Sequence, residues 1–231
     1  MSVAILILAY NEQHWIDRVL NQWVGFHRLV LVSSKPWRGE HKFSDMTAEI
    51  ARGLGVEVHE QYWKSEEDQR NWGLARLYDY DYVLIVDADE LYEDPKAVVA
   101  GLDGEACYRA KEIITYWKTP EYRLDPLDKH KPVIAVDPKR IKFRELRMPM
   151  PLDDNVPWNE QPFLPVTTHH MKWVKPNRDI YEKLRIFENY NKVEGWYENV
   201  WCKWTPGSDM VVTPFQREHQ VAILCNSPYL P

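Results

Sequence analysis

The feature that most constrains the fold is an alternation of apolar runs and helical segments in the first hundred residues. The apolar runs occupy 3–9, 28–33 and 82–86, and the alternating segment VEVHE at 56–60 is a further predicted strand. Between them, the segments 15–23, 45–54 and 65–78 have the spacing or the capping residues of helices. Strands and helices that alternate in this way form an open, mostly parallel sheet covered on both faces. We therefore predict an α/β fold.

The second half of the chain has a different texture. Nine of the sixteen prolines fall between residues 119 and 165, where only 132–136 and 140–143 stand out as strands. We expect loops and short antiparallel strands there. Residues 166–174 are predicted to be extended and 177–191 helical, whereas the aromatic segment that follows shows no clear pattern. Because 231 residues suit one core and nothing resembles a linker, we expect a single domain.

Composition excludes several classes of protein. The net charge of −6 provides no overall positive field for nucleic acid or anionic lipid. The cysteines, Cys107, Cys202 and Cys225, are too dispersed to indicate a disulfide framework or a zinc ribbon. The first apolar run follows no basic segment, and no run is long enough to span a bilayer. We expect a cytoplasmic protein without a transmembrane segment.

Acidic residues cluster where the fourth predicted strand ends. Asp87, Asp89 and Glu90 follow the run YVLIV directly. Ligands of open α/β sheets bind at the carboxyl ends of the strands. Two carboxylates separated by one residue can reach the same side of a turn, and Mg²⁺ and Mn²⁺ prefer such oxygen ligands. The sequence therefore predicts a divalent metal site, with a solvated acidic turn before the next helix as the alternative.

Three strings resemble the family 2 glycosyltransferases of the GT-A fold: LAYNE at 8–12, QRNWGLA at 69–75 and VDADE at 86–90. The likeness is greatest to the subgroup with an N-terminal NE motif and a DxDE motif. It implies a GT-A-like, Rossmann-like domain in which residues 1–118 bind a nucleotide sugar and 119–231 face the acceptor. It also implies that Asp87 and Asp89 hold Mn²⁺ or Mg²⁺ against the diphosphate of the donor.

The same resemblance implies contacts to the donor nucleotide. The end of the first strand would frame the base and ribose, through Ala9, Tyr10, Asn11 and Glu12. Ser33 and Ser34 stand where the family often has an acid, a departure that leaves the identity of the base open. For Asn11 and Glu12, capping of the following helix is the structural alternative.

The helix after the third predicted strand carries the next candidates. Arg70 and Asn71 resemble polar positions that approach the donor, and Gly73 would let the helix pack closely. The alternative for Arg70 is an ion pair with Glu66 or Glu67 one helical turn earlier, which contributes only tenths of a kcal/mol at an exposed site.

The segment TTHHMKWVKP at 167–176 is the second informative stretch. Adjacent histidines on an extended segment point to opposite faces, so at most one is expected to face a given site. The resemblance implies a histidine metal ligand here, and we favour His170 over His169, with a hydrogen-bonded structural histidine as the alternative. Nearby cations, Lys172, Lys175 and Arg178, would neutralise a departing diphosphate.

These residues predict a metal-dependent transfer of a sugar from a nucleotide diphosphate donor to an acceptor hydroxyl. Asp153, Asp154 and Glu160 are the candidates for the base that takes the acceptor's proton, and we favour Asp154. Glycans, lipid-linked sugars, proteins and modified nucleobases remain open as acceptors. Tryptophans that would either stack on sugar rings or fill the core are Trp117, Trp158, Trp196 and Trp201.

Two other functions stay open. A sugar-phosphate nucleotidyltransferase would share the sheet and the acids, although such enzymes usually carry a glycine-rich basic loop after the first strand, where this chain has YNEQH. A non-catalytic module that binds carbohydrate or nucleotide would keep the fold without the reaction.

Overall fold

The computed structural model describes most of the chain. The described residues are 1–36, 45–125, 127, 131–145, 147–152, 161–186, 195–206, 211–213 and 220–226. The helices are α1 (Ile16–Gln22), α2 (Thr47–Gly53), α3 (Glu66–Arg76), α4 (Pro95–Ala100), α5 (Asn177–Ile186) and the π-helical turn η2 (Tyr197–Trp201). The strands are β1 (Val3–Ala9), β2 (His27–Ser33), β3 (Glu57–Gln61), β4 (Tyr82–Asp87), β5 (Glu90–Tyr92), β6 (Cys107–Trp117), β7 (Thr119–Asp125), β8 (Val133–Val136), β9 (Ile141–Glu145), β10 (Met148–Pro151), β11 (Phe163–Trp173), β12 (Val211–Thr213) and β13 (Gln220–Asn226).

The predicted parallel sheet is present, in the order β4-β1-β2-β3. All four strands were expected from the sequence, and β1 is buried along its whole length, as a strand covered on both faces must be. Leu8 of β1 lies opposite Asp87 of β4, so the two strands end at the same edge. The fold class is confirmed: an open, mostly parallel sheet flanked by helices, with a small antiparallel part formed by β9 and β10.

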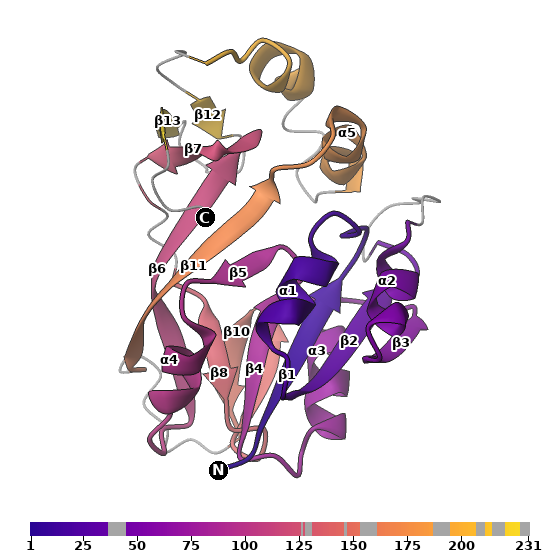
Figure 1. Cartoon of the computed structure of the whole chain (residues 1–231), viewed down its shortest axis with the longest axis vertical. Coiled ribbons are helices and arrows are strands. Elements are labelled where there is room, and N and C mark those ends of the chain that lie inside the picture. Colours follow the sequence, from indigo (N-terminus) through magenta and orange to yellow (C-terminus); the bar gives the residue numbers. More distant parts are fainter. Residues whose placement is uncertain are drawn as a thin grey trace.

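The helices cover the sheet on both faces (Figure 1). On one face, α1 and α2 pack through residues such as Val19 and Ala51 against the side of β1 that carries Ile5. On the other face, α3 packs through Leu74 against Leu6 and Leu31. Ser65 caps α3 as predicted, since its side chain accepts a hydrogen bond from the Asp68 N–H at 3.2 Å.

The close approach of α3 to the sheet depends on Gly73, as the sequence suggested. A Cβ atom at this position would lie 2.5 and 2.7 Å from the two methyl carbons of Leu6 and 3.1 Å from a methyl carbon of Leu31. Both leucines are fully buried, so neither can turn aside into solvent. The absence of a side chain at Gly73 is therefore what sets the distance between helix and sheet.

The second half extends the sheet with more strands than expected. β8 pairs antiparallel with β4, and β6 pairs antiparallel with β8. Neither β6 nor β7 was predicted, because charged residues interrupt β6 and prolines surround β7. β11 begins at Phe163, earlier than expected, and pairs with both β6 and β5. Residues 166–173 are extended and Asn177–Ile186 is helical, as predicted, while residues 187–191 of the predicted helix lie outside the described residues.

A group of tryptophans forms a separate core beyond the parallel sheet. Trp117, Trp173 and Trp201 are almost completely buried together with Ile180 and Leu184 of α5. The centroids of Trp117 and Trp201 are 4.9 Å apart with an edge-on geometry. For Trp117, Trp196 and Trp201 the core interpretation therefore holds, whereas Trp158 lies outside the described residues.

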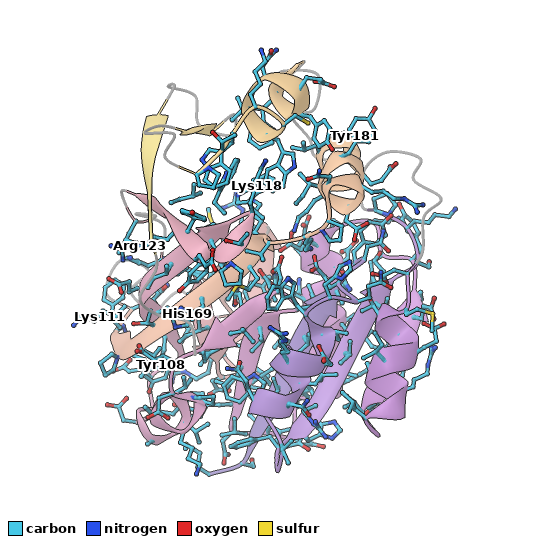
Figure 2. All side chains as sticks on the ribbon, turned by 45° about the horizontal axis from the view of Figure 1, so that its top comes forward. Tyr108, Lys111, Lys118, Arg123, His169 and Tyr181 are labelled. Atoms are coloured by element: carbon cyan, nitrogen blue, oxygen red, sulfur yellow. The ribbon has the colours of Figure 1, made fainter. Side chains whose placement is uncertain are left out.

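Lys118 lies against this tryptophan group (Figure 2). Its ammonium nitrogen is 5.0 Å from the ring centroid of Trp201 and 5.4 Å from that of Trp204. Burial lowers the pKa of Lys118.

In the part of the chain that the structure describes, no helix has the length and apolar character needed to cross a bilayer.

Candidate functional site

The pairing of strands brings distant segments of the chain to one edge of the sheet (Figure 1). The Ala88 N–H donates to the Leu8 carbonyl at 3.1 Å, which ties the acidic turn to the end of β1. β11 runs antiparallel to β5 with His170 opposite Glu90, and the Met171 N–H donates to the Asp89 carbonyl at 2.8 Å. The acids after β4, the loop after β1 and the histidine segment of β11 therefore share one site, as the ligand-binding edge of such a sheet requires.

Two arginines neutralise the first acid of the DxD motif. The Arg70 guanidinium lies 3.2 Å from Oδ1 of Asp87, and the Arg147 guanidinium lies 3.2 Å from Oδ2. Burial alone would raise the pKa of Asp87, but Arg147 and Arg70 outweigh it and hold the pKa below its usual value. Arg70 also pairs with Glu66 of α3, as the structural alternative predicted.

Arg147 is the residue that sequence reasoning missed. It donates to both oxygens of Glu90, at 2.6 and 2.9 Å, and also to the Ile85 carbonyl. It thereby joins the end of β4 to the acid that begins β5. An arginine in a proline-rich stretch gives no signal of this role, because its partners lie about sixty positions earlier in the chain.

The second acid of the motif has a different environment. Nζ of Lys183 lies 3.2 Å from Oδ2 of Asp89, and Nζ of Lys175 lies 3.7 Å from the same oxygen. On the other side, Nε2 of His170 is 3.3 Å from Oδ1. Burial would raise the pKa of Asp89, but Lys183, His170 and Lys175 hold it well below its usual value. The carboxylate is therefore charged and shared among several groups.

Glu12, from the loop after β1, completes this network. It forms a buried ion pair with Lys175, and Nζ of Lys183 lies 3.6 Å from its Oε1. Burial and the neighbouring Asp89 carboxylate raise the pKa of Glu12, whereas burial lowers the pKa of Lys175. Among the described residues, Oε2 of Glu12 has no hydrogen-bond partner. The predicted capping alternative does not hold, because α1 begins at Ile16 with Trp15 as its N-cap and without a side-chain cap. The pairing of Glu12 with Lys175 was not predicted.

The arrangement around Asp89 suits part of a metal coordination sphere. Neighbouring ligands of an ion with bonds of about 2.1 Å lie about 3 Å apart, close to the separation of Asp89 Oδ1 and His170 Nε2. No three histidine, cysteine or acidic side chains in the described ranges form a complete site on their own. An ion there would need further oxygens from a ligand or water, as is usual for Mg²⁺. Asp87 already pairs with two arginines. The residues that fit an ion are therefore Asp89 and His170.

The two histidines point in different directions, as predicted. Nδ1 of His169 lies 2.9 Å from the hydroxyl oxygen of Tyr116, and the pair is buried. Burial lowers the pKa of His169. The preference for His170 over His169 at the site therefore agrees with the geometry, and His169 takes the structural role.

Asn71 and Ser33, which were predicted to contact the nucleotide-sugar donor, have structural contacts within the protein. The Asn71 side chain donates to the Phe143 carbonyl at 2.8 Å and accepts from the Phe143 N–H at 2.7 Å, so it joins α3 to β9 instead of approaching a donor. Ser33 is buried, and its hydroxyl donates to the Lys35 carbonyl at 2.5 Å. The Ser33 hydroxyl therefore has a structural partner within its own turn.

The remaining candidates have mixed outcomes. Ala9 ends β1 at the site edge and Tyr10 follows it, where burial raises the pKa of Tyr10 to about 12. Asn11 adopts a φ of 55°, in the left-handed region, at the turn between β1 and Glu12. Of the predicted cations, Lys175 lies beside Asp89, whereas the ammonium nitrogen of Lys172 lies 5.1 Å from the Trp173 ring centroid. Lys183 of α5 is the second lysine beside Asp89. Asp153, Asp154 and Glu160 lie outside the described residues.

The sequence matches no protein-family model and no curated protein. Solved structures with some similarity include mannosyl-3-phosphoglycerate synthase from Rubrobacter xylanophilus, at 12% identity and a TM-score of 0.46, over 96% of this chain and 87% of that one. The glycosyltransferase GlyE of Streptococcus pneumoniae is similar at 12% identity and a TM-score of 0.33, over 86% and 40%. Mannose-1-phosphate geranyltransferase from Thermus thermophilus is similar at 13% identity and a TM-score of 0.30, over 58% and 50%.

Proposed function

We propose that this protein transfers a sugar from a nucleoside diphosphate donor to an acceptor hydroxyl. The observation that carries the proposal is the meeting of Asp89, His170 and Lys183 at the carboxyl ends of β1 and β4. Open parallel sheets bind their ligands at this edge. The combination of a metal-type ligand pair with an adjacent ammonium group suits a ligand that is strongly anionic, such as a diphosphate.

The chemistry follows from the charges of these groups. Breaking the bond between sugar and diphosphate develops negative charge on the leaving oxygen, and cationic groups fixed in advance stabilise that charge. Lys183 is placed to do so from α5, while Lys175 keeps Glu12 neutralised behind it. A bound Mn²⁺ or Mg²⁺ would neutralise further charge on the diphosphate. Asp89 and His170 would hold it.

The base that takes the acceptor's proton is also part of the proposal. Asp154, with Asp153 and Glu160 as alternatives, remains the candidate, and the acceptor remains a hydroxyl of a glycan, lipid-linked sugar, protein or modified nucleobase. The loop after β1, YNEQH, has no glycine, lysine or arginine with which to hold a triphosphate. These features favour sugar transfer over nucleotidyl transfer.

Release of nucleoside diphosphate from a panel of nucleotide sugars, with Mn²⁺ or Mg²⁺ present, tests the proposal. The wild-type protein should turn over at least one donor, and Asp89→Asn should lower turnover by about a hundredfold or more. Asp81→Asn removes an exposed carboxylate near the N-terminus and is the matched control, with turnover unchanged. If Asp89→Asn retains full turnover, or if pyrophosphate is released from a triphosphate instead, sugar transfer at this site is ruled out.

A further inference from the structure

The two lysines beside Asp89 differ in their access to solvent. The Lys175 side chain is 2% exposed and lies against Glu12, whereas the Lys183 side chain is 20% exposed. The His170 side chain on the other side of Asp89 is 22% exposed. A ligand that enters from solvent therefore meets Lys183 and His170, with Lys175 and Glu12 behind them.

Lys183 and a divalent ion would use the same carboxylate. Nζ of Lys183 lies 3.2 Å from Oδ2 of Asp89, while His170 faces the other oxygen of that group. An ion bound between Asp89 and His170 would lie within a few ångströms of this ammonium group, and like charges at that separation repel strongly in a partly buried site. The single negative charge of Asp89 cannot neutralise both the divalent ion and the Lys183 ammonium group.

A diphosphate would remove this conflict. Its oxygens carry the additional negative charge that a lysine and a divalent ion together require, and Lys183 lies on the accessible side, where it can turn from Asp89 to a phosphate. Glu12 cannot supply this charge: its Oε1 lies 3.6 Å from Nζ of Lys183, but the same oxygen already pairs with Lys175 in the interior. The ion and the diphosphate would therefore each improve the binding of the other.

We propose that Lys183 competes with a divalent ion for Asp89 and transfers to the diphosphate of the donor, so that ion and nucleoside diphosphate bind cooperatively. This inference rests on the proposed function, because it takes a nucleoside diphosphate as the ligand. Lys183 is thereby assigned as a diphosphate-binding residue that also weakens binding of the ion alone.

Mn²⁺ binding measured from the free-ion electron paramagnetic resonance signal tests this inference without any turnover. For the wild-type protein, the nucleoside diphosphate of an active donor should tighten Mn²⁺ binding by about tenfold or more. Lys183→Met should bind Mn²⁺ alone about tenfold more tightly than wild type, and the nucleotide should then tighten Mn²⁺ binding by a smaller factor than in the wild type. Lys183→Arg, which keeps the charge, should behave like the wild type.

Lys139→Met is the matched control, since it removes one exposed lysine far from the acids and should leave Mn²⁺ affinity unchanged. Thermal melting of each variant shows that it is folded. Unchanged or weaker Mn²⁺ binding by Lys183→Met, or the absence of any effect of nucleotide on the wild type, would overturn the competition. Donor turnover accompanied by such a result would leave the proposed function intact, whereas absence of nucleotide binding under every condition would remove the proposed function itself.

Discussion

Replacement of Arg147 by methionine should strongly destabilise the protein. The Arg147 side chain is 9% exposed and that of its partner Glu90 only 2%. The substitution keeps much of the apolar volume and removes the cation that neutralises Glu90. Removing one member of a buried ion pair costs about 3–5 kcal/mol, because the remaining charge stays buried.

The contacts of each partner refine this magnitude. Glu90 would lose hydrogen bonds of 2.6 and 2.9 Å and, among the described residues, keep only a long one from the Asp87 N–H at 3.3 Å. Asp87 would lose one arginine but retain Arg70, and 29% of its side chain is exposed. Most of the loss should therefore come from Glu90, with a free energy of unfolding lower by about 3–5 kcal/mol.

Urea unfolding at neutral pH, followed by tryptophan fluorescence, measures this change. The double variant Arg147→Met with Glu90→Gln removes the unpaired charge, so it should be more stable than the sum of the two single effects predicts, by about 1–3 kcal/mol. Arg140→Met is the matched control: it removes an exposed arginine that donates to the Gly104 carbonyl, and it should cost no more than about 1 kcal/mol. A loss below about 1 kcal/mol for Arg147→Met, or strict additivity in the double variant, would refute the buried-pair argument.

Two further substitutions test the core. Gly73→Ala should lower the free energy of unfolding by about 1–2 kcal/mol, since crowding against Leu6 costs about 1–3 kcal/mol and outweighs the gain in helix propensity of about 0.5–1 kcal/mol; a higher melting temperature would contradict this. Trp117→Ala should cost about 3–5 kcal/mol because the ring lies inside the tryptophan core, whereas Tyr62→Ala, at an exposed aromatic, should stay within about 0.5 kcal/mol. A stable Trp117→Ala variant in urea unfolding would show that this tryptophan does not hold the core together.

Local patterns were sufficient where the structure depends on neighbours in sequence. The unbroken apolar run of β1 could only suit a strand buried on both faces, and Ser65 marked the start of α3. The position of the acids after β4 followed from the rule for strand ends. Even the opposite directions of His169 and His170 came from the alternation of side chains along a strand.

Pairings between distant segments were not accessible in the same way. β6 was missed because polar residues interrupt its apolar pattern, and its burial comes from β8 and β11, which follow it in the chain. The choice between roles for Arg70 was open for a similar reason: the pattern indicated Glu66 as its partner, but nothing in the spacing indicated Asp87.

The sequence by itself determined the parallel half-sheet, the helices that cover it and the edge at which the acids lie, because hydrophobic periodicity and capping act over a few residues. Only the tertiary structure decided which charges meet there. Arg147 neutralises Asp87 and Glu90, and Lys183 reaches Asp89, through strand pairings and helix packing that span 57 to 94 positions of the chain. Charge interactions depend on distance in space and on burial, and neither quantity is contained in a local pattern.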